Sequence, residues 1–165
     1  DVKARTTAIA NKLSTLSSLK TLIQKAESVA LLSTLDTINA HALEYLEAFF
    51  PEESIVATLE SFSQAKTSKK IKPSINISIN HKGEEMPYAC LSGGEKIRIV
   101  TAFNLALGEL EPSPIILLDE VTANLDVELT EDILDFIKKN TEGKIVIVIA
   151  HQCITGLFDN VMEFQ

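Results

Sequence analysis

The first fifty residues contain neither proline nor glycine, and this restricts the chain more than any other feature of its sequence. These two residues interrupt helices most strongly, so their absence favours one continuous helix. At a rise of about 1.5 Å per residue, such a helix would be roughly 75 Å long. No clear cap marks its beginning, as expected if it is cut from a longer helix. Pro51 is expected to end it.

Apolar residues in this segment follow a seven-residue repeat. One column of the repeat is apolar throughout: Val2, Ile9, Leu16, Ile23 and Ala30. The second column begins with charged residues and becomes apolar: Arg5, Lys12, Leu19 and Ala26. The frame then shifts by one residue, to Leu31, Ile38 and Tyr45 alongside Leu35, Ala42 and Phe49. The repeat favours a coiled-coil stub, and the alternative is an amphipathic helix packed on its own domain.

Composition excludes several classes of protein. The 165 residues are 45% hydrophobic and 23% charged, enough for one domain with its own core. No run approaches the length of a membrane-spanning helix, and the first residues do not form a signal peptide. Cys90 and Cys153 do not make a disulfide framework, so an intracellular setting is expected. The net charge of −8 means that any DNA contact needs a local basic patch.

The middle of the chain predicts a β-meander. Residues 54–62 and 74–79 have strand patterns, and a turn is expected around Gly83. Between the strands lies a basic cluster: Lys66, Lys69, Lys70 and Lys72. A solvated hairpin loop explains these lysines, and contact with a phosphate backbone is the alternative.

The last third of the chain alternates helix and strand. A helix that begins at the double glycine is expected to end at Gly108. Residues 115–118 and 144–150 are short apolar runs, typical of strands covered on both faces. A helix at about 127–139 separates them, which predicts a βαβ unit with parallel strands. The expected fold class is therefore α/β: a parallel βαβ core with a β-meander, preceded by a long helix.

Polar residues follow both of these predicted strands. Asp119 and Glu120 come after the first, and His151 comes after the second. Ligands of open α/β sheets bind beyond the carboxyl ends of the strands. Nucleotide hydrolysis needs a carboxylate for Mg²⁺, a carboxylate that orients water and a group near the γ-phosphate, and these three residues match. A helix-capping loop and a buried core histidine are the alternative interpretations.

The segment Ser92-Gly93-Gly94-Glu95 has the form of a capping box. Unpaired N–H groups and the positive end of the helix dipole gather at a helix N-terminus. Glycines there leave room for a phosphate, at a cost in helix stability. A plain cap in a tight turn is the alternative.

Four segments together resemble the ABC-ATPase superfamily. "LSGGEK" (91–96) looks like its signature motif and "IILLDE" (115–120) like its Walker B motif. "ANLD" (123–126) resembles its D-loop and "IAHQ" (149–152) its switch-histidine loop. Glu95, where transporters usually carry glutamine, is similar to the branch with long coiled coils. That branch contains the chromosome-organising SMC proteins and the SbcC/Rad-type DNA-repair ATPases.

The resemblance also explains a missing motif, because no G-x-x-x-x-G-K-[ST] loop is present. In this family the Walker A half of the ATPase head lies at the far end of the polypeptide. The resemblance implies that residues 1–50 form a coiled-coil stub and residues 51–165 the C-terminal lobe of the head. The implied cofactors are ATP and Mg²⁺, and the implied partners are the Walker A half and a second head in a homodimer.

The resemblance further assigns a role to each motif. Asp119 would hold Mg²⁺, while Glu120 and His151 would be catalytic, at the ATP held by the same head. A second set of residues would contact the nucleotide of the second head, in a dimer that holds ATP between the two heads: Leu91, Ser92, Gly93, Gly94, Glu95, Lys96 and, in the D-loop, Asp126.

Two branches of the family remain open. "TANLD" favours a DNA-repair ATPase with a metal-dependent nuclease partner, acting on DNA ends. Val121, where repair types often show proline, favours an SMC-type clamp that organises chromosomes. Either would act on DNA inside the cell. A non-catalytic binding module is a third interpretation, which Glu120 disfavours.

Overall fold

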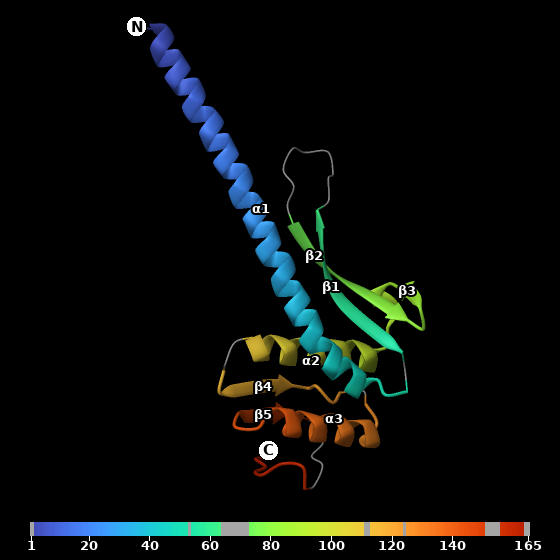
Figure 1. The fold of residues 1–165 in the computed structure, drawn as a ribbon. Coiled ribbons are helices and arrows are strands. Elements are labelled where there is room, and N and C mark those ends of the chain that lie inside the picture. Colours follow the sequence, from blue (N-terminus) through green and yellow to red (C-terminus); the bar gives the residue numbers. More distant parts are fainter. Residues whose placement is uncertain are drawn as a thin grey trace. The chain divides into compact units, whose positions relative to one another are not determined.

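A computed structural model describes residues 2–52, 54–63, 73–110, 113–123, 125–150 and 156–163 (Figure 1). Its contacts divide the chain into two units, residues 1–36 and 37–165. The elements follow the expected order: a long helix, a meander, a helix and a βαβ unit. None of the described helices is long and apolar enough to cross a membrane.

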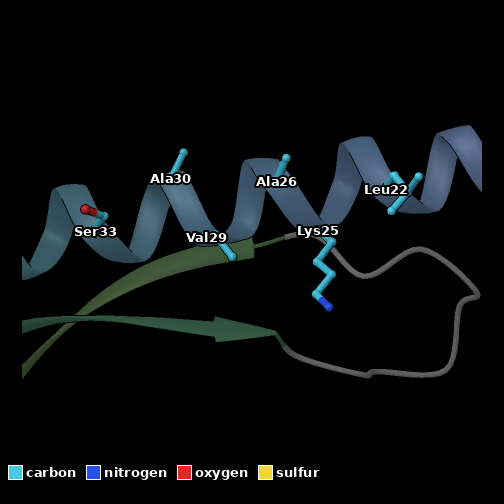
Figure 2. Close-up of a pocket in the computed structure, with 6 residues that line it drawn as sticks. All are labelled: Leu22, Lys25, Ala26, Val29, Ala30 and Ser33. Atoms are coloured by element: carbon cyan, nitrogen blue, oxygen red, sulfur yellow. The ribbon is translucent and has the colours of Figure 1, made fainter.

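Helix α1 (Val2–Phe49) has 48 residues without a break, which confirms the predicted continuous helix. Over residues 2–30 the large apolar residues of the repeat stay exposed: Val2, Ile9, Leu16, Leu19 and Ile23. Six neighbouring side chains line an open pocket on this helix (Figure 2): Leu22, Lys25, Ala26, Val29, Ala30 and Ser33. An exposed heptad stripe with small residues is typical of a helix that pairs with another.

The end of α1 behaves differently and belongs to the core of the second unit. Five apolar side chains on one face of it are at most 5% exposed: Ile38, Ala42, Tyr45, Leu46 and Phe49. The rings of Tyr45 and Phe49 meet Phe136 edge to face, with centroids about 6 Å apart. The shift in the heptad frame thus falls where the helix changes from an exposed stripe to a packed face.

The meander is an antiparallel sheet in the order β1-β2-β3, as predicted. Its strands are β1 (Ile55–Ser63), β2 (Pro73–His81) and β3 (Glu84–Met86). The turn between β2 and β3 places Lys82 and Gly83 at positive φ, as a tight two-residue hairpin requires. The side chain of Asn39 in α1 exchanges two hydrogen bonds with the backbone of Leu59, which ties β1 to the helix.

The C-terminal part contains the predicted βαβ unit. Strands β4 (Ile115–Asp119) and β5 (Ile145–Ile149) pair in parallel, and α3 (Val127–Asn140) connects them. Helix α2 (Gly93–Leu110) follows a short 3₁₀ turn, η1 (Tyr88–Cys90). The prediction that α2 ends at Gly108 is wrong by two residues. The helix continues because Glu109 bonds to α1 and Lys144 donates to the Gly108 carbonyl.

The prediction that β4 and β5 are covered on both faces is also wrong within the described residues. Ile116, Leu118, Val146 and Val148 point into or pack against the core. The alternate side chains of both strands are between 44% and 68% exposed: Ile115, Leu117, Ile145, Ile147 and Ile149. We call these five residues the open face. They are apolar, yet no described element packs on them.

Candidate nucleotide-binding site

The start of α2 forms the capping box that the sequence predicts. The Glu95 N–H donates to Ser92 Oγ at 3.2 Å, and the Ser92 N–H donates to Glu95 Oε2 at 2.6 Å. Leu91 is 4% exposed and anchors this turn in the core, whereas Ser92 and Gly93 are exposed. Gly94, the second residue of α2, is buried. The capping box therefore holds a helix N-terminus at which Ser92 and Gly93 are exposed, the arrangement that suits an anion.

The Glu95 carboxylate is stabilised in its charged form. Hydrogen bonding to Ser92 holds its pKa below the ordinary value, and the nearby charge of Arg98 acts in the same direction, while burial opposes both. A carboxyl group with a lowered pKa in the folded state adds stability above its unfolded pKa. That contribution is lost as the pH falls through the lowered value.

We expect Glu95→Gln to destabilise the protein more at pH 7 than in acid. Glutamine can still close the box, but it lacks the charge, so the difference in unfolding free energy from wild type should shrink as the pH falls through the lowered Glu95 pKa. Urea unfolding at pH 7 and at pH 3 measures it. Glu131→Gln, at an exposed position of α3, controls for the loss of one negative charge. An equal difference at both pH values would contradict the role of the ionised carboxylate.

The acid pair lies at the carboxyl edge of the two parallel strands. Asp119 is in register with Ile149, and the Glu120 N–H donates to the Ile149 carbonyl at 2.9 Å. The end of β4 is therefore bonded directly to the end of β5. Both acidic residues are exposed at this edge. His151 follows two residues after β5 and lies outside the described residues, so its proximity to the pair stays a prediction.

Glu120 has a backbone conformation that is unfavourable for its residue type. Its φ is 52°, in the left-handed region, and its carbonyl accepts from the Ala123 N–H in the tight turn that follows. Left-handed backbone costs a residue with a Cβ about 1–2 kcal/mol. Strain of this kind is concentrated at functional sites, where the surrounding structure holds the side chain in place.

We expect Glu120→Gly to be more stable than Glu120→Ala by about 1 kcal/mol, because glycine adopts positive φ without a steric cost. Both variants remove the same carboxylate, so the comparison isolates the backbone. Urea unfolding of the two variants measures the difference. Equal stabilities, or a more stable alanine variant, would show that the turn is not strained.

Asp126 caps the next helix, a role that the sequence reasoning missed. Its Oδ1 accepts from the Leu129 N–H at 2.8 Å, and Asp126 is the N-cap residue of α3. An aspartate directly before an amphipathic helix is the signal that could have revealed it. Its expected position at a dimer interface stays a prediction.

The remaining predicted residues lie in different settings. The Lys96 ammonium donates to the Ala89 carbonyl at 3.3 Å and lies over the Tyr88 ring, so it is directed towards η1. The basic cluster lies outside the described residues, and its DNA contact stays a prediction: Lys66, Lys69, Lys70 and Lys72. Sequence reasoning also missed Arg98, which is 8% exposed within the apolar stripe of α2. The sequence signal that could have revealed it is a charged residue at a position where the helical pattern of α2 otherwise has apolar residues.

The residues at the sheet edge fit Mg²⁺ only as part of a shared site. Among the described residues no group of three or more acidic, histidine or cysteine side chains could hold a metal ion. Magnesium in nucleotide sites usually takes one or two carboxylates together with phosphate oxygens and water. The exposed Asp119 could supply one such carboxylate, and the nucleotide the remaining oxygens.

Comparisons with known proteins agree with this geometry. A family model described as "RecF/RecN/SMC N terminal domain" matches residues 4–161. The uncharacterised protein 050L of Invertebrate iridescent virus 6 is 36% identical over the whole chain. The chromosome partition protein Smc of Methanocaldococcus jannaschii is 45% identical over 62 residues, 38% of this chain. The crystal structure of a Smc head domain with a coiled coil and joint from Pyrococcus yayanosii is 25% identical, with a TM-score of 0.61 over 79% of this chain and 24% of that one.

The chain spans only a small part of these relatives. It covers 16% of the viral protein and 5% of the archaeal one. The matched residues nevertheless include the capping box at the start of α2, the acid pair after β4 and most of the long helix. The chain therefore belongs to the RecF/RecN/SMC family, and its α/β fold with a long N-terminal helix matches part of an SMC head domain with a coiled coil.

Proposed function

We propose that this chain is the C-terminal half of a split ABC-type ATPase head, which binds and hydrolyses ATP together with a Walker A half. One observation carries the proposal. The chain has an acid pair at a sheet edge and an exposed, glycine-lined helix start, but it has no phosphate-cradling loop of its own. Each feature is one part of a nucleotide site, and the missing part is the one that holds the phosphates.

The open face supports a second lobe as partner. Five aliphatic side chains on two adjacent strands form a contiguous apolar surface that leads to the acid pair. Exposed apolar patches of this kind mark interaction sites, and parallel strands are usually covered on both faces. A Walker A half that packs here would bring its bound nucleotide to Asp119 and Glu120.

The two ends of the site then have different tasks. Asp119 would share Mg²⁺ with the phosphates, Glu120 would orient the attacking water, and His151 would contact the γ-phosphate. When bound, Mg²⁺ neutralises charge that develops on the phosphates. Ser92 and Gly93 are exposed and would contact the nucleotide of a second head, with the buried Gly94 directly behind them. ATP would bring two heads together, and hydrolysis would release them.

The DNA process served by this cycle has two candidates. The names of the relatives favour an SMC-type clamp that organises chromosomes, since chromosome partition proteins from several microorganisms match this chain. The segment "TANLD" (122–126) favours DNA double-strand-break repair with a nuclease partner. Affinity capture of the full-length protein distinguishes them: a kleisin-like bridging subunit supports the clamp, and a metal-dependent nuclease supports repair.

The central experiment combines this chain with its Walker A half and measures ATP turnover. We expect the mixture to hydrolyse ATP and each half alone to be inactive. Turnover by this chain alone, or none by the purified complex of both halves with ATP and Mg²⁺, would contradict the proposal.

A further inference from the structure

We propose that Arg98 is a positioning residue that ties the start of α2 to the end of α1, and so fixes the geometry of the phosphate-facing serine. The consequence for ATP rests on the function proposed above, whereas the structural link itself does not. All the contacts concerned lie within residues 37–165, which form one compact unit.

The first contact of Arg98 is with the last turn of α1. Its Nη1 donates to the Phe49 carbonyl at 2.8 Å, and its guanidinium lies 4.0 Å from the centre of the Phe50 ring. Carbonyls in the last turn of a helix lack intrahelical partners and carry partial negative charge. A buried, charged hydrogen bond to such a carbonyl is stronger than a neutral one. Arg98 therefore serves as a cap for α1 that is supplied by another helix.

The second interaction of Arg98 is electrostatic and is directed towards the nucleotide end of α2. Glu95 lies three residues before Arg98, a spacing that brings two side chains together on a helix, and the charge of Arg98 favours the ionised Glu95 carboxylate. That carboxylate accepts from the Ser92 N–H at 2.6 Å. The end of α1 is thus linked to Ser92 in three steps: the hydrogen bond of Arg98 to Phe49, the charge of Arg98 one helical turn from Glu95, and the bond of Glu95 to Ser92.

A separate contact holds the opposite end of α2 and provides a control. Glu109 accepts a hydrogen bond from the Tyr45 hydroxyl, and its other oxygen lies 2.8 Å from His41 Nδ1. Burial, and then the bond to Glu109, raises the Tyr45 pKa above its ordinary value, so the hydroxyl remains a donor at neutral pH. This contact joins the same two helices as Arg98 but lies 11 residues further along α2 than Arg98. Its loss should weaken the helix pair without reaching Ser92.

Three variants of the full-length protein separate positioning from general stability. Arg98→Met removes the charge and the fork of donors but keeps an unbranched apolar stem. Arg98→Lys keeps the charge without the planar fork that stacks on an aromatic ring, and it supplies a folded variant if the methionine variant does not fold. Tyr45→Phe removes one hydrogen bond at the distal contact.

The direct measurement is amide hydrogen exchange at Glu95 and Lys96. Their N–H groups donate to Ser92 Oγ and to the Ser92 carbonyl, so they report on the capping box. We expect exchange roughly tenfold faster in Arg98→Met, a smaller increase in Arg98→Lys, and wild-type rates in Tyr45→Phe. Unchanged exchange in both Arg98 variants, or an equal increase in Tyr45→Phe, would overturn the inference.

The functional measurement compares nucleotide binding by one head with association of two heads. We expect Arg98→Met to bind a fluorescent ATP analogue as a monomer like wild type, but to dimerise with ATP roughly tenfold more weakly, with partial rescue in Arg98→Lys. Monomer binding that weakens in parallel, or undiminished dimerisation, would overturn the role at the second nucleotide. If wild-type heads do not associate with ATP while the exchange effect is present, the proposed function fails and the positioning role stands.

Discussion

Glu120→Gln is expected to slow ATP turnover by the completed head by about two to four orders of magnitude, the usual contribution of a positioned general base. Glutamine has nearly the same shape as glutamate, so the strained turn at φ 52° and the bond to Ile149 should persist. ATP binding should survive because the phosphates are held by other groups. Dimers that form with ATP should therefore accumulate, since the step that releases them is blocked.

Steady-state phosphate release and size-exclusion chromatography with ATP measure the two effects together. Glu142→Gln, in the exposed turn before β5, is the matched control and should keep wild-type turnover. Turnover that Glu120→Gln leaves unchanged would refute the catalytic role. A loss of ATP binding in this variant would instead mean that Glu120 holds the nucleotide.

Leu117→Asp is expected to prevent this chain from binding its Walker A half. Leu117 is 68% exposed on the open face, so the charge is well solvated in the isolated chain and should cost it little stability. In a complex the same carboxylate would be buried without a partner, and such burial costs several kcal/mol. A few kcal/mol correspond to a loss of affinity of at least a hundredfold.

Copurification of the two halves, followed by titration, tests this expectation. Met162→Asp makes the same kind of change at an exposed apolar residue outside the open face and should bind normally. Thermal unfolding of the isolated chain checks that Leu117→Asp remains folded. A folded Leu117→Asp that binds the Walker A half with wild-type affinity would show that the open face has another purpose.

Local patterns were sufficient to predict most of the fold. The absence of proline and glycine before Pro51 predicted α1, and the spacing of the apolar runs predicted the parallel strands β4 and β5. The capping box was also predictable, because Ser92 and Glu95 need only each other. These features depend on residues close in sequence, where propensity and spacing act directly.

Features that depend on distant residues were not predictable in the same way. The two interpretations of the heptad repeat each describe part of α1: the frame with Leu16 and Ile23 is exposed, and the frame with Tyr45 and Phe49 is buried. Which frame packs on the domain depends on residues far along the chain.

The position of Gly108 shows the same limit. It is a common type of C-terminal cap in sequence, but contacts made by Glu109 and Lys144 extend the helix past it. The role of Arg98 depends on a carbonyl 49 residues away, which no local pattern contains.

The apolar runs of β4 and β5 were correctly predicted to be strands, but the prediction that both faces of these strands are covered was wrong. A continuous apolar run indicates a strand whose two faces are both buried in the complete protein. It does not indicate whether the same chain or a partner covers each face. Within the described residues one face is covered and the other is open. Sequence alone could not separate a partner from the chain's own core.

The most direct test of the account is the mass of completed heads with and without ATP, measured by light scattering for wild type and for Ser92→Arg. Ser92 is exposed at the start of α2, so arginine should leave the isolated head folded and able to bind ATP, yet block the approach of the second nucleotide. We expect ATP to convert wild-type heads from monomers to dimers and to leave Ser92→Arg monomeric. Dimers of Ser92→Arg that form with ATP as readily as wild type would contradict it.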